Sequence, residues 1–301
     1  LLQMIPVFLG ATLIVYLLAF YTSGDPILTL AGDKPISPAV EQRLREQYNL
    51  DQPVLVQWLL YLKSVLTFDL GVGFNGRPLW DQIAAAFPTT FRLAIIAVVV
   101  ETIFGVAAGV ISGLRKGKLI DTTLLMLSLL LIATPTFVLG FLAQFVFGLQ
   151  LGIAPINVGR DPSWQNLLLP GIVLGGVSFA YVLRLTRTSI AETAGADHVR
   201  TATAKGLSRG GVVSKHVLRN SLIPVVTFIG ADLGALMGGA IVTERVFNVP
   251  GIGTLLFSSI NAGEAPMIVS LVTLLVIIFL LSNLVVDLLY GVLDPRIRYA
   301  K

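Results

Sequence analysis

Two acidic residues, Glu101 and Asp232, stand inside long apolar runs of the chain. A charged side chain at the centre of a bilayer costs about 2.5–3.5 kcal/mol on an insertion scale, so such residues usually line a transport pathway or pack against a polar neighbour. A proton relay is a third option, but neither run carries a His or Lys that could pass a proton on. We expect a pathway or packing role for both carboxylates.

Signatures of catalysis are missing from the chain. It has no cysteine, and therefore no thiolate metal site. No H-E-x-x-H sequence and no nucleophile–base pairing are visible. A P-loop is absent as well, because Gly117-Lys118 lacks the preceding glycine and is followed by Leu119. We expect no catalytic residue, no metal ligand and no cofactor bound by this chain, so an energy source must come from a partner.

The longest polar interruption in the second half of the chain is Ala191–Pro224. From Arg184 to Arg219, seven Lys and Arg residues stand against two acids, Glu192 and Asp197. Apolar runs flank this stretch, and basic loops between membrane spans lie on the cytoplasmic side. We expect a cytoplasmic loop over residues 186–220 that contacts a partner there. The alternative is an ordinary basic loop without a partner.

Turn and helix signals divide this loop into two parts. Asp197 to Lys205 can form a short helix, Gly206 allows a sharp turn, and Arg209 to Asn220 can form a second helix ahead of Pro224. These helices would carry small apolar faces flanked by cations, made by Val199, Ala202, Val212, Val213 and Val217. Faces of this size are too small for a permanent interface and would suit a contact with a partner that moves.

Composition places the chain among polytopic membrane proteins. Its 301 residues are 55% hydrophobic and 13% charged, with a mean hydropathy of +0.84, which is more apolar surface than a soluble domain can bury. The net charge of +4 comes from basic residues beside apolar runs, so we expect contact with a lipid bilayer and not with nucleic acid. The chain opens directly into an apolar run without a cleavage site, so we expect no signal peptide and some residues before Leu1.

The hydrophobic pattern predicts one all-α transmembrane domain with six spans, each long enough for a hydrocarbon core of about 30 Å. The expected spans cover residues 1–21, 91–113, 121–149, 167–185, 221–242 and 266–289. Pro135 should kink the third. Residues 22–87 are expected to form a small extracytoplasmic insertion, with one helix capped by Ser37-Pro38 and ending near Tyr48, and an amphipathic helix over Val54–Leu66.

The distribution of Lys and Arg predicts that both termini are cytoplasmic. In the fifth span, Gly230, Gly234 and Gly238 form a small-residue face that would pack against a partner helix or border a pathway. The segment TERVFNVPGIG at 243–253 should lie at the outer mouth, as a gate or docking segment or else as a plain loop. Its candidate residues are Glu244, Phe247, Pro250, Gly251 and Gly253.

The basic loop resembles the cytoplasmic signature of binding-protein-dependent ABC importer permeases, which reads Glu-Ala-Ala, three residues, Gly, nine residues, Ile-x-Leu-Pro. Ala202, Gly206 and Leu218 match, whereas Arg200 and Arg219 replace the leading Glu and the closing Pro. The divergent form VRTA-x-AKGL followed by H-x-LRN-x-L-IP resembles the dipeptide/oligopeptide/nickel permease subfamily. Further blocks in the same order are GDP at 24–26, NLDQP at 49–53, FDLG at 68–71, TPTF at 134–137, TERVFNVPGIG at 243–253 and DLLYGVLDPRIRY at 287–299.

This resemblance, closest to the first (B-type) of two peptide-permease subunits, implies a type I ABC importer permease fold in the inner or plasma membrane. It implies import of di- or oligopeptides with a second homologous permease, two ABC ATPase subunits that bind ATP and Mg, and an extracytoplasmic substrate-binding protein. The coupling residues would be Asp197, Val199, Arg200, Ala202, Lys205, Gly206, Leu207, Arg209, His216, Leu218, Arg219 and Asn220.

Other functions stay open at this point. A permease of the same type could carry nickel or another small solute. A proton-coupled secondary transporter would need inverted repeats or more spans. An intramembrane enzyme is the least supported of these, because no catalytic grouping is visible in the chain.

Overall fold

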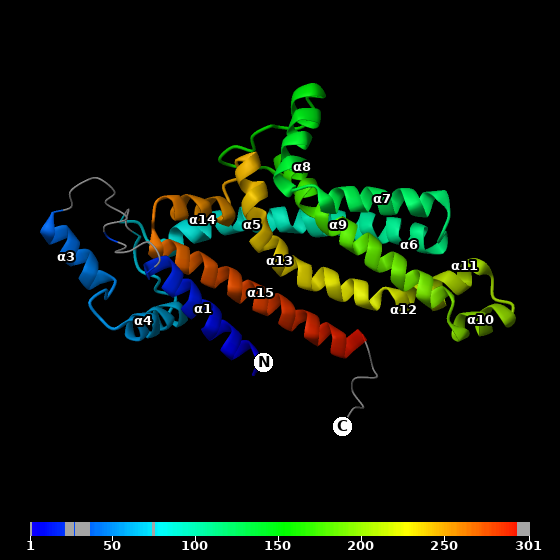
Figure 1. Ribbon diagram of the computed structural model, residues 1–301, viewed down its shortest axis with the longest axis horizontal. Helices are drawn as coiled ribbons and strands as arrows, with labels where there is room; N and C mark the ends of the chain where they lie inside the picture. The colour runs from blue at the N-terminus through cyan, green and yellow to red at the C-terminus, as the bar shows by residue number, and fades with distance from the viewer. Residues whose placement is uncertain (1, 22–26, 28–36, 74–75, 294–301) are drawn as a thin grey trace. The chain divides into compact units, whose positions relative to one another are not determined.

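The computed structural model describes residues 2–21, 27, 37–73 and 76–293 (Figure 1). These residues are almost entirely helical, and their one extended pairing is an isolated antiparallel bridge between Val72 and Pro78. The sequence block at 24–26, the last six residues (294–299) of the block at 287–299, and Lys34-Pro35, where the sequence predicts a turn, lie outside the described residues. The chain divides into two compact units: Leu1–Thr90 with Pro250–Leu280, and Phe91–Val249 with Leu281–Lys301.

The elements follow one another along the chain with few long connections. Those before the basic turn at Arg115, Lys116 and Lys118 are α1 (Met4–Tyr21), α3 (Pro38–Gln47), α4 (Val54–Leu66), α5 (Leu79–Val100), the π-helical η1 (Glu101–Gly105) and α6 (Val106–Leu114). Those up to the basic loop are α7 (Leu119–Ala133), α8 (Thr136–Ala143), the π-helical η2 (Gln144–Gln150) and α9 (Trp164–Ala194). The remainder are α10 (Asp197–Ala204), α11 (Arg209–Val212), the π-helical η3 (Val213–Leu218), α12 (Arg219–Ser221), α13 (Ile223–Phe247), α14 (Ile252–Asn261) and α15 (Ala265–Leu293).

The first unit contains the two short helices predicted from local signals. Ser37 caps α3 through its side chain, Pro38 occupies the first turn, and Glu41 adds a favourable charge there, so the predicted helix is confirmed. Helix α4 spans the predicted residues Val54–Leu66. Its Trp58 and Tyr61 pack against a buried cluster of α1 and α15 side chains.

A buried polar side chain, Gln57, also fixes α4 in this unit. It is 3% exposed and accepts a hydrogen bond from the Tyr16 hydroxyl at 3.1 Å. Its amide nitrogen donates to the carbonyl oxygens of Leu50 and Gln52, at 3.2 and 2.7 Å. Because every polar atom of this amide has a partner, its burial costs little. The hydrophobic pattern of α4 did not reveal it.

Helix α9 is the centre of the second unit and packs along α6, with further contacts to η1, α7, α8 and α13 (Figure 1). Three glycines at every fourth position, one at the end of η1 and two in α6, let these segments approach α9 closely. A Cβ atom at Gly105, Gly109 or Gly113 would lie 2.8, 2.5 or 2.7 Å from the nearest side-chain atom of α9. Real Cβ atoms do not make such contacts, so this Gly-xxx-Gly-xxx-Gly face is a requirement of the packing.

The number of spans predicted from the sequence falls within what the described helices allow. Four helices are long and apolar enough to cross a bilayer: Met4–Tyr21, Leu79–Leu114, Trp164–Ala194 and Ala265–Leu288. Two bent helix pairs bring the number to six if each pair is one span. These pairs are Leu119–Ala133 with Thr136–Gln150, and Arg209–Ser221 with Ile223–Gly238.

Several helix boundaries differ from the expected spans. The helix expected to start at 91 begins at Leu79, so residues 79–87 do not belong to an insertion loop. Pro88 stays inside that helix, as proline can in membrane helices when neighbours satisfy the freed carbonyl. Helix α9 runs to Ala194, nine residues beyond the expected end at 185, because no Pro or Gly stands between Leu185 and Gly195.

The kink expected at Pro135 is a break. The axes on either side differ by 105°, and the backbone of Thr134 and Pro135 is extended, with ψ of 125° and 138°. Proline removes the helical hydrogen bond and disfavours helical geometry in the residue before it, so two residues leave the helix instead of one. The predicted single span is therefore a pair of helices at a steep angle.

Candidate functional site

The basic loop folds into two short helical segments joined by a left-handed glycine. Helix α10 ends at Ala204, and Gly206 has a φ of +80°. Ser208 then caps the next segment by accepting a hydrogen bond from the Gly211 amide at 3.3 Å. From Arg209 the backbone stays helical to Ser221, with a π-helical stretch in the middle. The predicted helices and the predicted turn at Gly206 are thus present.

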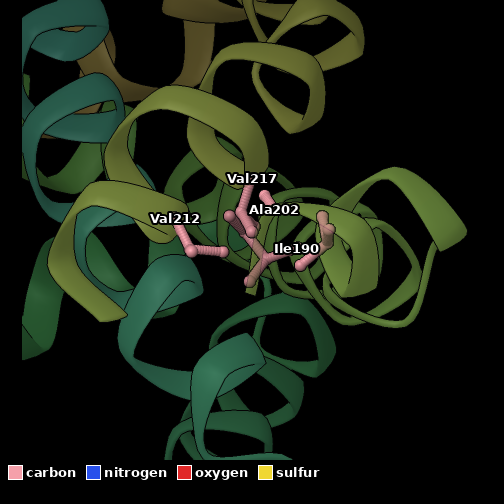
Figure 2. Close-up of a cluster of buried hydrophobic side chains, with 5 residues drawn as sticks. Ile190, Ala202, Val212 and Val217 are labelled. Atoms are coloured by element: carbon pink, nitrogen blue, oxygen red, sulfur yellow. The ribbon is translucent and has the colours of Figure 1, made fainter. Parts of the chain in front are cut away.

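The apolar residues of this loop pack inside the chain. Val199 and Ala202 of α10 join Val212 and Val217 of the second segment around Ile190 of α9, and all are under 10% exposed (Figure 2). We expected these residues to present apolar faces to a partner, and the burial corrects that expectation. Their role is to dock the loop on the end of α9. Val213 is only partly buried.

The polar residues of the loop remain at the surface. Asp197 and Arg200 form an exposed (i, i+3) ion pair at 3.7 Å, which contributes little to stability. His216 and Leu218 are partly buried. The exposed candidate residues are Asp197, Arg200, Lys205, Gly206, Leu207, Arg209, Arg219 and Asn220. The surface that a partner would contact is therefore polar and basic. Among the exposed candidate residues, Leu207 is the one large hydrophobic side chain.

Two serines, which the sequence analysis did not single out, tie the end of the loop to α9. The Ser189 hydroxyl donates to the carbonyl of Ser221 at 2.8 Å, and the Ser221 hydroxyl donates to the carbonyl of Ser189 at 3.1 Å. Nearby, the Asn220 amide donates to the carbonyl of His216 at 3.0 Å and lies 3.4 Å from the ring of His198. The loop is thus held to α9 by the apolar cluster along its length and by this reciprocal pair at its end.

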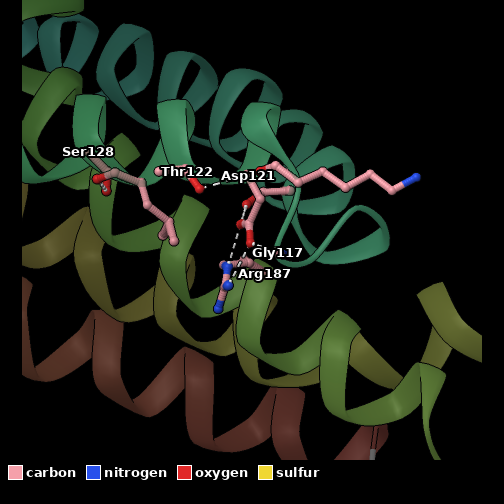
Figure 3. Close-up of polar contacts among 8 residues, drawn as sticks. Gly117, Asp121, Thr122, Ser128 and Arg187 are labelled. Carbon is pink, nitrogen blue, oxygen red and sulfur yellow. Dashed lines mark hydrogen bonds and ion pairs between the residues drawn. The ribbon is translucent and has the colours of Figure 1, made fainter.

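A buried ion pair connects the neighbouring basic turn to the same helix. Asp121, 2% exposed, accepts two hydrogen bonds from the guanidinium of Arg187, at 2.7 and 2.8 Å (Figure 3). It also accepts from the Ser112 hydroxyl and, at 2.8 Å, from the amide of Gly117. The bidentate geometry is the strong form of this interaction. It fixes the α6–α7 turn on α9, one helical turn before the loop cluster.

A hollow lies between this turn and the loop. Its volume is about 650 Å³, and its lining includes Leu114 and Lys116 from the turn and Leu207 and Arg209 from the loop. Val199 and Val217 of the apolar cluster also line it. The lining therefore combines apolar side chains with the cations Lys116 and Arg209.

The segment expected at the outer mouth is largely buried. Glu244 and Phe247 are 0% exposed, and Gly251 and Gly253 are buried. Helix α13 ends at Phe247, and the next residue, Asn248, adopts the left-handed conformation with φ of +53°. The amide of Gln144 donates to the carbonyl of Val246 at 2.9 Å, which ties this helix end to η2. Pro250 of this segment is half-buried. The burial tests neither the predicted gate role nor the predicted docking role of residues 243–253.

The candidate pathway residues also have defined surroundings. Glu101 is 0% exposed at the start of η1, and Asp232 on α13 is half-buried. Gly230 packs within the chain, since a Cβ there would lie 2.6 Å from Val286, whereas Gly238 faces open space and Gly234 is buried.

Metal binding receives no support from the described residues. Among them, no group of three or more His, Cys, Asp or Glu side chains is placed to hold an ion.

Comparison with known proteins gives concordant results. Residues 105–299 match the family described as "Binding-protein-dependent transport system inner membrane component". The chain is 40% identical over 300 residues to the glutathione transport system permease protein GsiC of Escherichia coli O6:H1, covering 99% of this chain and 97% of that protein. It is 34% identical over 327 residues to the dipeptide transport system permease protein DppB of Escherichia coli K12, covering 99% and 96%.

Solved structures show the same fold at low sequence identity. An inward-facing structure of the MetNI methionine ABC transporter has a TM-score of 0.59 at 16% identity, covering 70% of this chain and 96% of that one. An amino acid ABC transporter crystallised with histidines has a TM-score of 0.57 at 13% identity, covering 70% and 94%.

Proposed function

Because the chain belongs to the family of binding-protein-dependent transport system inner membrane components, we propose that it is the translocation subunit of an ATP-driven importer of short peptides. Relatives at 40% and 34% identity are named for glutathione and dipeptide transport, and both names denote short peptides. The type I permease fold predicted from the sequence is supported by the solved ABC transporter structures. ATP and Mg would be bound by partner subunits.

The basic loop is the part of the chain that would receive force from an ATPase. Its apolar cluster and the Ser189–Ser221 pair dock it on α9, and its polar side remains exposed. Because these contacts hold the loop on α9, a force that an ATPase applies to the loop would displace α9. A loop without these contacts would change its own conformation and leave α9 in place. This docking carries the proposal, and the contact residues would be the exposed Arg200, Lys205 and Leu207.

The complete transporter would contain further subunits. A second homologous permease would supply the other half of the pathway, two ABC ATPase subunits would bind the basic loops, and a substrate-binding protein would dock on the extracytoplasmic side. Both termini and the basic loop would be cytoplasmic, and residues 243–253 would contribute to the outer mouth. Permeation of nickel or of another solute, and proton-coupled transport, are the alternatives that an uptake assay distinguishes.

A substitution at Gly206 tests the coupling role. Leucine there would have to adopt a φ of +80°, which costs a residue with a side chain roughly 1–2 kcal/mol. We expect Gly206→Leu to shift the turn, to abolish substrate-stimulated ATP hydrolysis and to stop dipeptide uptake in proteoliposomes that contain all subunits. Gly210→Leu is the matched control, since Gly210 lies in the same loop with ordinary backbone geometry and open space around its Cβ position.

The outcome of these assays separates the possible functions. Wild-type stimulation and uptake in Gly206→Leu would show that the loop does not couple the subunits. Uptake by the wild-type transporter that survives ATP depletion but collapses with an uncoupler would favour proton-coupled transport. Competition among a labelled dipeptide, glutathione and Ni²⁺ would identify the substrate class.

A further inference from the structure

The proposed transport function assigns no role to the hollow between the basic turn and the basic loop. Its volume of about 650 Å³ is within the range of about 300–1,000 Å³ that small-molecule sites occupy. Three parts of the chain form it at one end of α9: the turn after α6, the end of α9 itself and the loop that carries α10 and η3 (Figure 1). All of its lining residues belong to the second unit.

The charge of this lining is positive. Lys116 and Arg209 are its two charged side chains, and no carboxylate is among the described residues that line it. Both cations are exposed, and neither forms an ion pair within the described chain. Asp121, which follows the turn, is bound to Arg187, and Glu192 of α9 does not line the hollow. Two cations without counter-charges attract an anion into the space between them.

The rest of the lining is largely apolar. Val199, Val212 and Val217 belong to the buried cluster on α9, and Leu114 and Leu207 extend this apolar surface. A small inorganic anion would leave these side chains in contact with water, whereas an anion with an apolar body would cover them as well. The lining therefore fits an amphipathic anion.

The hollow lies where the exposed apolar surface of the neighbouring helices begins. Leu119, directly after the basic turn, is 83% exposed, and Met126 and Leu130 of the same helix α7 are exposed as well. On α6, Ile111 is exposed one turn before Leu114 of the lining. Both helices belong to segments long and apolar enough to cross a bilayer, and basic residues beside such segments lie at the level of the lipid head groups. The hollow is therefore at the boundary between head groups and lipid chains.

We propose that the hollow binds one anionic phospholipid, with its phosphate between Lys116 and Arg209 and an acyl chain along the exposed face of α6 that contains Ile111. Basic pockets between membrane helices bind such head groups, and long basic side chains reach them from an apolar surface. An acidic segment of an ATPase is the competing occupant. Such a segment would have to bring apolar side chains to the bilayer boundary, whereas phospholipid is in contact with this boundary at all times.

A lipid in this position connects the turn directly to the loop. The ion pair of Asp121 and Arg187 fixes the turn on α9, and the apolar cluster fixes the loop on the same helix. A phosphate held by Lys116 and Arg209 adds a link between the two. Anionic lipid should therefore hold the loop more firmly in its docked position. This effect on transport rests on the proposed function, whereas the lipid site itself does not.

Native mass spectrometry of the full chain in detergent micelles tests the site without any transport assay. The micelles contain equal amounts of dioleoylphosphatidylglycerol, which is anionic, and dioleoylphosphatidylcholine, which has the same acyl chains and no net charge. We expect the wild type to retain one phosphatidylglycerol molecule. Lys116→Gln combined with Arg209→Gln should lower the affinity for this lipid about 30-fold, because each basic residue near an anionic lipid contributes about fivefold.

Three further variants serve as controls. Lys118→Gln combined with Lys215→Gln removes the same charge from the same turn and loop, but neither residue lines the hollow, so the affinity should change less than about threefold in physiological salt. Lys116→Arg combined with Arg209→Lys keeps both charges and should keep the lipid. Ala194→Phe keeps every cation but places a ring in the hollow and should displace the lipid. All five positions are exposed, so the chain should fold in each variant.

The pattern across these variants decides the matter. Equal losses in the two charge-removing double variants would overturn the proposal in favour of a general attraction between a basic surface and anionic lipid. Unchanged retention in Ala194→Phe would place the lipid outside the hollow and would also overturn it. Displacement of the lipid by excess inorganic phosphate would identify a site for a simple anion instead. Failure to retain phosphatidylglycerol would overturn the proposal as well, and loss of ATPase binding in Lys116→Gln with Arg209→Gln would then assign the hollow to the ATPase.

Substrate-stimulated ATP hydrolysis by the assembled transporter gives a second readout. It should be faster in proteoliposomes that contain phosphatidylglycerol than in those of phosphatidylcholine alone, and Lys116→Gln combined with Arg209→Gln should remove this difference. Retention of the lipid without any dipeptide uptake would count against the peptide-import function and leave the lipid site standing. Equal hydrolysis in both kinds of vesicle by a wild type that retains the lipid would refute the link between the site and transport.

Discussion

Replacing Asp121 with Asn would remove the acceptor on which four hydrogen-bond donors converge. Two of these come from the guanidinium of Arg187, one from the Ser112 hydroxyl and one from the Gly117 amide. An Asn amide group would place N–H donors beside the guanidinium, so Arg187 would keep its charge without a counter-charge. The perturbation acts on the α6–α7 turn and on α9 together.

The burial of the pair sets the magnitude of this effect. The Asp121 side chain is 3% exposed and that of Arg187 is 20% exposed. Removing one partner of a buried pair costs about 3–5 kcal/mol, and the partial exposure of Arg187 places the expected loss near the lower limit, about 3 kcal/mol. The loss should appear in the free energy of unfolding, measured by denaturant titration of the chain in detergent micelles.

A matched control and a double variant make this prediction decisive. Asp161→Asn changes an exposed aspartate of the same unit and should shift the unfolding free energy by less than about 0.5 kcal/mol. Asp121→Asn combined with Arg187→Gln should cost less than the sum of the two single changes, because the unpaired charge is then gone. A loss below about 1 kcal/mol in Asp121→Asn would refute the conclusion that this pair holds the turn on α9.

Two further predictions concern helix contacts. Gly109→Ala should lower the unfolding free energy by about 1–3 kcal/mol, typical of overpacking, because its Cβ would lie 2.5 Å from Thr186. The same change at Gly10, which has open space around it, is the control and should be neutral or stabilising. Equal effects at both sites would contradict the close α6–α9 packing. Tyr61→Phe removes the 2.6 Å hydrogen bond to Thr273 and should lower the unfolding free energy by about 1 kcal/mol in the same titration. Thr273→Val should cost little more in a chain that already carries Tyr61→Phe. Fully additive losses of the two changes would disprove that contact.

The sequence alone was sufficient where local chemistry decides the conformation. The cap at Ser37, the turn at Gly206 and the two helical segments of the basic loop were predicted, because each depends on residues within a few positions of one another. The composition likewise determined the membrane class, and the order of the sequence blocks indicated the family that the comparisons then showed.

Tertiary structure decided which faces of these helices are used. The spacing of the apolar residues Val199 and Val217 in the sequence would be the same whether they packed against a partner or against their own chain. Only the position of Ile190 in the structure shows that they pack on α9. The sequence analysis did not single out Gly109 and Gly113 of α6, and their importance follows from α9 lying against them. At Pro135, the sequence predicted a bend, whereas its size depends on two residues leaving the helix together.

The pairing of distant polar residues was beyond sequence reasoning for a physical reason. Asp121 and Arg187 lie 66 positions apart, on α7 and α9. Helical periodicity shows which side of a helix a residue occupies, but not which helix will lie opposite it. Composition and local pattern therefore identified a membrane protein with a basic loop, and the resemblance of its sequence blocks indicated a permease. The packing of α9 against its neighbours determined what docks that loop.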